Sequence, residues 1–139
     1  MSSLNRLMSR GIVPPQVHGV LDYPLAAVLI AGPLVLNFDN TAATVIALVF
    51  GGGAALLAVG TAWSTGIVKV IPPLLHGYVD LVVTIALIVL PFAIGFTHDT
   101  TALVFYLVVG AGGLLVTLET RFEPLPATST HAMMPPEPA

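Results

Sequence analysis

Two histidine–aspartate pairs are the residues of this chain whose types and spacing could do chemistry. His18 and Asp22 stand four residues apart, and so do His76 and Asp80. On a helix this spacing places both side chains on one face, so that the carboxylate reaches the imidazole one turn away. An imidazole beside a carboxylate can coordinate a metal, serve as an oriented cofactor ligand or pass a proton.

Both pairs belong to an internal duplication. The stretch 14–22, PPQVHGVLD, returns 58 residues later at 72–80 as PPLLHGYVD. Prolines, a histidine, a glycine and an aspartate agree in register, which an apolar composition alone does not produce. We therefore interpret the chain as two copies of one unit, repeat one over 12–60 and repeat two over 70–118.

Composition predicts that these units lie in a membrane. Of the 139 residues 56% are hydrophobic and 8% are charged, whereas in soluble domains about 25% are charged. Four apolar segments come close to the ~20 residues that cross a bilayer, namely 16–38, 42–62, 73–96 and 101–118. The predicted fold is an all-α membrane protein with four transmembrane helices, arranged as a tandem duplication of a two-helix hairpin.

The basic residues predict the orientation of the helices. They are confined to the side shared by the N-terminus, the central loop and the C-terminus: Arg6, Arg10, Lys69 and Arg121. The positive-inside rule makes this side cytoplasmic. Because each repeat has two spans, the copies have the same orientation, and we expect a pseudo-two-fold axis along the membrane normal.

Three regions follow from this topology. We predict a cytoplasmic leader over 1–13, a four-helix transmembrane domain over 14–122 and a disordered, proline-rich cytoplasmic tail over 123–139. In the second helix of each repeat, glycines at 51–53 and at 110, 112 and 113 predict close helix packing.

The placement of ionisable residues within spans predicts a polar site inside the bundle. Such residues almost always face the bundle interior, so His18 and Asp22 are expected to face His76 and Asp80. In one interpretation these residues only tie the first and third helices together. In another they form a cofactor site, in which His18 and His76 ligate a haem or other tetrapyrrole. Alternatively the two histidines, with their aspartates, hold a metal ion.

A proton or ion pathway through the same residues is a third interpretation. It has less support because the outer half of the first and third helices is Leu, Ile and Pro, which gives no continuous polar path. The identity of any cofactor stays open between haem, another tetrapyrrole and a metal ion.

Several functions are excluded or disfavoured by composition. Without cysteine there are no thiolate metal sites and no cysteine nucleophiles. A net charge of −3 argues against a nucleic-acid partner, and the short loops leave no room for a soluble active site. We predict a non-enzymatic membrane protein, an accessory or assembly subunit of a larger membrane complex. Its partners would be the lipid bilayer and either other membrane subunits or further copies of itself.

The repeated Pro-x-x-His-Gly-x-x-Asp opening, followed about one helix later by Pro33 or Pro91, resembles the SPW-repeat family of small bacterial membrane proteins. At the positions of the family's Ser-Pro-Trp signature this chain has 32–34, GPL, and 90–92, LPF. The resemblance implies a duplicated pair of spans in a bacterial inner membrane. It implies no activity and no catalytic residues.

Overall fold

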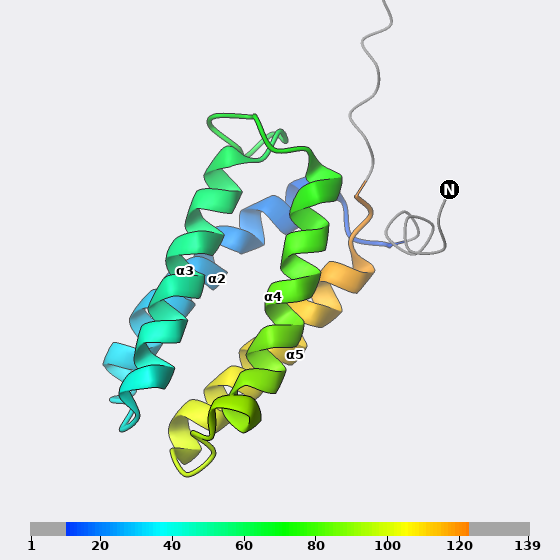
Figure 1. Cartoon of the computed structure of the whole chain (residues 1–139). Coiled ribbons are helices and arrows are strands. Elements are labelled where there is room, and N and C mark those ends of the chain that lie inside the picture. The colour runs from blue at the N-terminus through cyan, green and yellow to red at the C-terminus, as the bar shows by residue number, and fades with distance from the viewer. Residues whose placement is uncertain (1–10, 123–139) are drawn as a thin grey trace, which may run out of the picture.

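Four long helices make up the computed structural model, which describes residues 11–122. They are α2 (Pro15–Val35), α3 (Thr41–Gly60), α4 (Pro73–Ile94) and α5 (Thr100–Glu119) (Figure 1). Each is long and apolar enough to cross a membrane, which confirms the all-α fold with four spans. The predicted tail and the first ten residues of the predicted leader lie outside the described residues.

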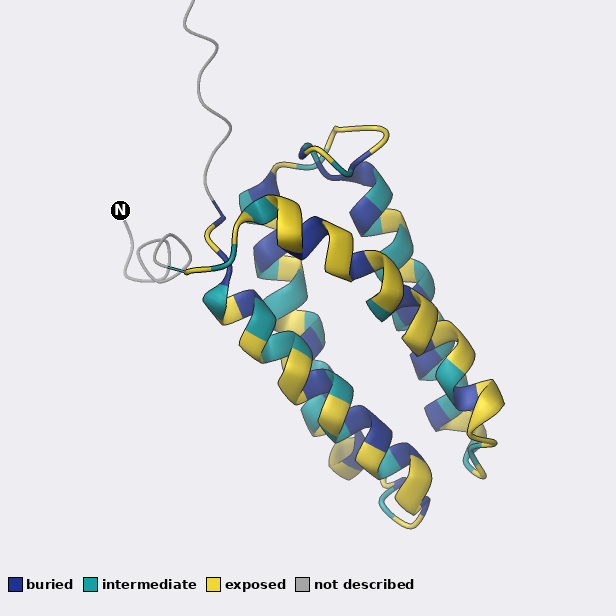
Figure 2. Cartoon of the chain, turned by 180° about the vertical axis from the view of Figure 1, so that it is seen from behind, coloured by how far each residue is buried: buried dark blue, intermediate teal, exposed yellow. Residues whose placement is uncertain are grey.

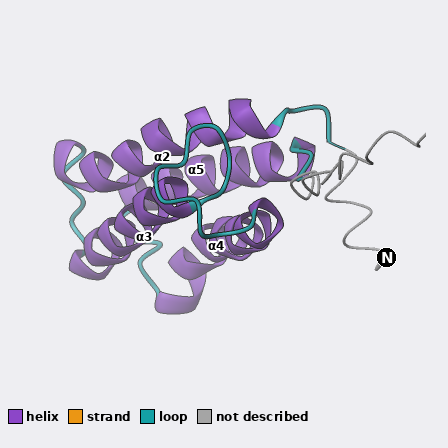
Figure 3. Cartoon of the chain, turned by 90° about the horizontal axis from the view of Figure 1, so that it is seen from above, coloured by secondary structure: helices purple, strands orange, loops and turns teal. Residues whose placement is uncertain are grey.

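The helices form two antiparallel hairpins. Most contacts between helices are within the pairs α2 with α3 and α4 with α5, while α2 meets α5 and α3 meets α4 only sparsely (Figures 1 and 3). At one end of the bundle, here called the turn end, lie the two short turns within the hairpins. At the other, here called the terminal end, the central loop lies near both ends of the described chain.

Side-chain caps begin the second helix of each hairpin. Asn40 Oδ1 accepts the N–H of Ala43 at 3.0 Å, and Asp99 Oδ1 accepts the N–H of Ala102 at 2.9 Å. Each bond satisfies a backbone donor that has no partner within its helix. The first helices instead begin at Pro15 and Pro73, whose missing N–H would be unpaired there in any case.

The hairpins contact each other at the turn end through an apolar cluster and two hydrogen bonds. The cluster consists of buried Leu29, Ala43, Ala47, Leu87, Phe96, Ala102, Phe105 and Tyr106. The Tyr106 hydroxyl donates to the carbonyl of Ala43 at 2.6 Å, and the Asn40 N–H donates to Asp99 Oδ2 at 2.9 Å. We call this set of contacts the turn-end junction.

Only some of the glycines that were predicted to allow close helix packing lie against another helix. A Cβ on Gly51 would lie 2.7 Å from Ile30 Cγ1, and one on Gly110 would lie 2.8 Å from Ile88 Cγ1. Within the bundle the prediction is confirmed for these two and for Gly113, but not for Gly52, Gly53 and Gly112, where a Cβ would meet nothing within 4 Å. Neighbouring helix positions point about 100° apart, so adjacent glycines cannot all face the same helix.

Large apolar side chains cover the outer faces of the helices. Leu56 is 74% exposed, Val82 68% and Leu115 62%, and exposed residues recur along the helices in Figure 2. In water such surfaces would be unfavourable, whereas in a bilayer they contact lipid.

Candidate functional site

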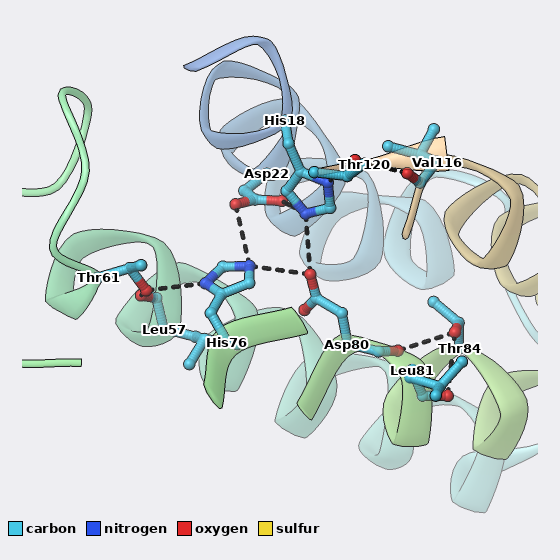
Figure 4. A network of polar contacts seen from close by, with 10 residues as sticks. All are labelled: His18, Asp22, Leu57, Thr61, His76, Asp80, Leu81, Thr84, Val116 and Thr120. Atoms are coloured by element: carbon cyan, nitrogen blue, oxygen red, sulfur yellow. Dashed lines mark hydrogen bonds and ion pairs between the residues drawn. The ribbon is translucent and has the colours of Figure 1, made fainter. Parts of the chain in front are cut away.

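The two histidine–aspartate pairs meet at the terminal end, between α2 and α4 (Figure 4). One ligand atom from each of His18, Asp22, His76 and Asp80 lies within 4.8 Å of the other three. We call these four residues the His–Asp cluster. The structure thus brings together every residue that the sequence predicted for the site.

The distances within the cluster cross between the helices as well as along them. His18 Nε2 lies 3.2 Å from Asp22 Oδ1 and 2.9 Å from Asp80 Oδ2. His76 Nε2 lies 3.3 Å from Asp22 Oδ2 and 2.8 Å from Asp80 Oδ2. Each imidazole therefore faces both carboxylates, one from its own helix and one from the other hairpin.

Burial makes the charge of this cluster costly. His18, Asp22 and His76 are 2%, 6% and 1% exposed, while the Asp80 side chain is 19% exposed. Ionised groups taken out of water require compensating charges close by. Two carboxylates at this depth are therefore matched either by protons on both imidazoles or by a cation.

A threonine holds each imidazole from behind. Thr120 Oγ1 lies 2.7 Å from His18 Nδ1, and Thr61 Oγ1 lies 2.8 Å from His76 Nδ1. Each hydroxyl donates its only hydrogen to the helix carbonyl four residues earlier, at 2.6 Å. The oxygen can then only accept, so Nδ1 carries a hydrogen in both imidazoles and Nε2 is directed at the carboxylates.

Short backbone pairings place these threonines. Thr61, just after α3, pairs with Ile71 before α4, and Thr120, just after α5, pairs with Val13 before α2. The end of each hairpin is thereby joined to the start of the other. As a result, each threonine reaches the histidine of the opposite hairpin.

Two atoms of the cluster have no hydrogen-bond partner. His18 Nε2 and Asp80 Oδ2 form a hydrogen bond at 2.9 Å. His76 Nε2 and Asp22 Oδ2 are buried and form no hydrogen bond, although Nε2 lies within ion-pair distance of Asp22 Oδ2, at 3.3 Å, and of Asp80 Oδ2, at 2.8 Å. Unpaired buried polar atoms are uncommon in proteins, and a bound ion is one way in which such atoms are satisfied.

Two aromatic rings cover the cluster. The ring of Trp63 lies 4.4 Å from that of His76 and 5.6 Å from that of His18, centroid to centroid. Phe122 lies 5.1 Å from His18 and 6.4 Å from His76. Both aromatic residues are buried, so they limit the access of water from the terminal side.

The space beside Gly19 is filled as well. A Cβ there would clash with Thr65 Oγ1 and would lie 3.0 Å from the indole ring of Trp63. Glycine at this position allows the central loop to pack directly against α2. A flat ligand has no room on this side of the cluster.

Sequence reasoning did not identify the threonines and aromatic residues around the cluster. Thr61 and Thr120 are 59 residues apart, as are Trp63 and Phe122. The spacing is one residue longer than the 58 that separates the histidines, because α4 has 22 residues and α2 has 21. Comparing the second helices at a spacing of 59 would have revealed the threonine match.

The fold and the cluster define a multi-pass helical membrane protein with a buried polar site at one end of its bundle. The family model of the SPW repeat domain matches residues 16–120. The chain therefore belongs to the SPW repeat family, which confirms the resemblance noted in the sequence. Neither a curated protein nor a solved structure matches it.

Proposed function

We propose that this chain is a non-enzymatic membrane protein that binds one divalent transition-metal ion in the His–Asp cluster, and that the ion joins the two hairpins. The observation that carries the proposal is that the buried atoms His76 Nε2 and Asp22 Oδ2, which belong to different hairpins, face each other at 3.3 Å without forming a hydrogen bond. A cation between them would satisfy both.

The donor set fits such an ion. Two imidazole nitrogens and two carboxylate oxygens are ligands that Zn²⁺ and its neighbours accept. In a tetrahedral site with bonds of about 2.0–2.1 Å, neighbouring ligand atoms are roughly 3.3 Å apart. Two N···O separations in the cluster, 3.2 and 3.3 Å, match that spacing, while the other two, 2.8 and 2.9 Å, are shorter and would have to lengthen around an ion. A divalent ion would also neutralise the two carboxylates.

A structural role for the ion fits better than a catalytic one. Four protein ligands complete a tetrahedral shell, whereas catalytic zinc sites keep one position open for water or substrate. The threonines behind the imidazoles supply the partners that orient metal-binding histidines. Both features support a protein without enzymatic activity.

The tetrapyrrole interpretation has less support than a single ion. Axial histidines must face a macrocycle from opposite sides, yet each Nε2 here has carboxylate oxygens within 3.3 Å. Those oxygens occupy the space that the macrocycle would need. Ion conduction also has less support, because the turn-end junction fills the bundle with apolar side chains.

Zinc uptake tests the proposal. Purified protein stripped with a chelator and dialysed against Zn²⁺ is expected to bind one ion per chain. His76→Gln and Asp22→Asn each remove a ligand and should weaken binding by at least about 10-fold. His98→Gln is the control, because His98 is exposed at the turn end. Absence of stoichiometric zinc, or equal uptake by all four proteins, would contradict the proposal.

We also propose that the protein lies in a bacterial inner membrane with both termini in the cytoplasm. The support is the position of Lys69 and Arg121 at the terminal end and the lack of basic residues in the short turns. Single cysteines at Asn40, Ser64 and His98 in this cysteine-free chain test it. Only the one at Ser64 should react with an impermeant reagent from the cytoplasmic side; labelling of Asn40 from that side would refute the orientation.

An accessory role in a larger complex stays a prediction. Its support is the shortness of the loops, which leaves the apolar helix faces as the main surfaces for a partner. Purification in a mild detergent tests the role: a subunit should be recovered with other membrane proteins or as an oligomer. Recovery as a monomer alone would count against it.

A further inference from the structure

A cavity of about 310 Å³ adjoins the His–Asp cluster. Its polar end is formed by His18, Asp22, Asp80 and Thr84, and its remaining lining is nearly all apolar, with Leu25 on one wall. The cavity lies between the cluster and the turn-end junction, where the two hairpins are less tightly packed.

Two residues that line the cavity are exposed, Val28 on α2 (45%) and Val108 on α5 (66%), so we place the mouth of the cavity beside them. Both residues lie in the middle of apolar spans. In a membrane the mouth would therefore open toward the hydrocarbon of the lipid.

We propose that this cavity binds a single-chain amphiphile with a hydroxyl head group. The hydrocarbon chain of the amphiphile lies along the apolar walls of the cavity, and its hydroxyl donates a hydrogen bond to Asp80. This inference goes beyond the metal site and does not require it.

The volume of the cavity suits a hydrocarbon chain rather than a helix of another protein. Ligand sites begin at about 300 Å³, so one hydrocarbon chain can enter, with its far end leaving through the mouth. A helix about 10 Å across rises 5.4 Å per turn and occupies roughly 400 Å³ in a single turn. A transmembrane helix from another protein is too wide for the cavity.

The chemistry of the polar end selects the head group. Asp80 is the most exposed member of the cluster, and both of its contacts with the imidazoles use Oδ2. The Thr84 hydroxyl donates to the carbonyls of Asp80 and Leu81. A carboxylate only accepts hydrogen bonds, so the head must donate. An ionised carboxylate head can only accept hydrogen bonds, and a plain hydrocarbon has no hydrogen-bonding group, so neither offers a donor to Asp80.

Competition binding in detergent tests the proposal with three probes of equal chain length. Radiolabelled 1-dodecanol is bound to the full-length protein and displaced by unlabelled 1-dodecanol, dodecanoic acid or dodecane. We expect 1-dodecanol to compete at least 10-fold better than the other two. Equal competition by all three would overturn the proposal, because it would show partitioning without head-group recognition.

A matched pair of variants locates the binding. Gly112 lines the cavity and Gly52 does not, yet a Cβ at either position would meet nothing within 4 Å. Gly112→Leu adds an apolar side chain at the cavity wall and should lower 1-dodecanol affinity at least 10-fold, whereas Gly52→Leu should bind like the wild type. Wild-type affinity in Gly112→Leu would overturn the proposal.

The same experiment separates this inference from the metal proposal. Binding is measured in chelator-treated protein and again after addition of Zn²⁺. Dodecanol binding by protein that takes up no zinc would support the cavity and reject the metal site. Zinc uptake without selective dodecanol binding would support the metal site and reject the binding of an amphiphile in the cavity.

Discussion

The two ends of the bundle both join the hairpins, but they do so with different chemistry. At the turn end, Tyr106 and Asp99 each form a hydrogen bond to the other hairpin. Both oxygens of the Asp99 carboxylate accept a backbone N–H. At the terminal end the described residues include four buried side-chain atoms that form no hydrogen bond, on Asp22, Trp63, Thr65 and His76. The turn end is thus complete without a ligand, whereas the terminal end retains the capacity to bind one.

The largest effect is expected from breaking the terminal end. His76→Leu leaves two buried carboxylates with one imidazole and removes the partner of Thr61, which should cost about 3–5 kcal/mol. His76→Gln keeps a polar group in the same place and should cost less. Thermal unfolding in detergent measures both. Equal losses for the two variants would show that the cluster's polarity does not matter.

A smaller loss is expected from overpacking within repeat one. A Cβ on Gly51 would lie 2.7 Å from Ile30 Cγ1 and 3.0 Å from the Ile30 backbone nitrogen. Backbone cannot move aside as a side chain can, so Gly51→Leu should cost about 1–3 kcal/mol. Gly52→Leu is the control and should leave the melting temperature unchanged or raise it. If both variants lose the same stability, Gly51 does not lie at a close contact between α2 and α3.

The smallest effect is expected at the turn end, from Asp99. Burial alone raises the pKa of this carboxyl, but the N–H donors of Ala102 and Asn40 outweigh it and hold the pKa below its ordinary value. Asp99→Ala removes the helix cap and should cost about 0.5–2 kcal/mol at neutral pH, whereas Asp99→Asn keeps an acceptor and should be milder.

The lowered pKa fixes the sign of the pH dependence. Ionised Asp99 stabilises the fold at pH values above the ordinary carboxyl pKa, and this contribution is lost as the pH falls through the folded pKa. Below about pH 3.9 the stability of the wild type should approach that of Asp99→Ala. An unchanged gap between their unfolding curves on acidification would argue against the assigned cap.

Much of this organisation could be predicted from the sequence, for physical reasons. Hydropathy predicted the four spans to within three residues of the observed helix ends, because membrane thickness sets helix length. The spacing of 58 residues identified the four members of the His–Asp cluster. The predicted pseudo-two-fold axis and the three predicted regions of the chain stay predictions.

The features that were missed depend on helix rotation and on three-dimensional packing. Which of the adjacent glycines faces a neighbouring helix depends on how α3 is rotated about its own axis. Because α3 is apolar on all sides, its sequence does not reveal that rotation. The cavity arises where small residues such as Gly112 lie opposite α2. Trp63 lies near the membrane interface, where tryptophan is common as an anchor, so the sequence gave no reason to expect it against His76.

The fluorescence of Trp63 tests the metal site most directly. Trp63 is the only tryptophan in the chain, and its ring centroid lies 4.4 Å from that of His76. A paramagnetic Cu²⁺ ion bound at the His–Asp cluster should quench its emission saturably, with one ion per chain. We predict that His76→Gln shifts this quenching to at least about 10-fold higher Cu²⁺ concentrations and that His98→Gln leaves it unchanged. Emission that does not respond to Cu²⁺, or equal quenching in His76→Gln, would contradict a metal ion at the junction of the hairpins.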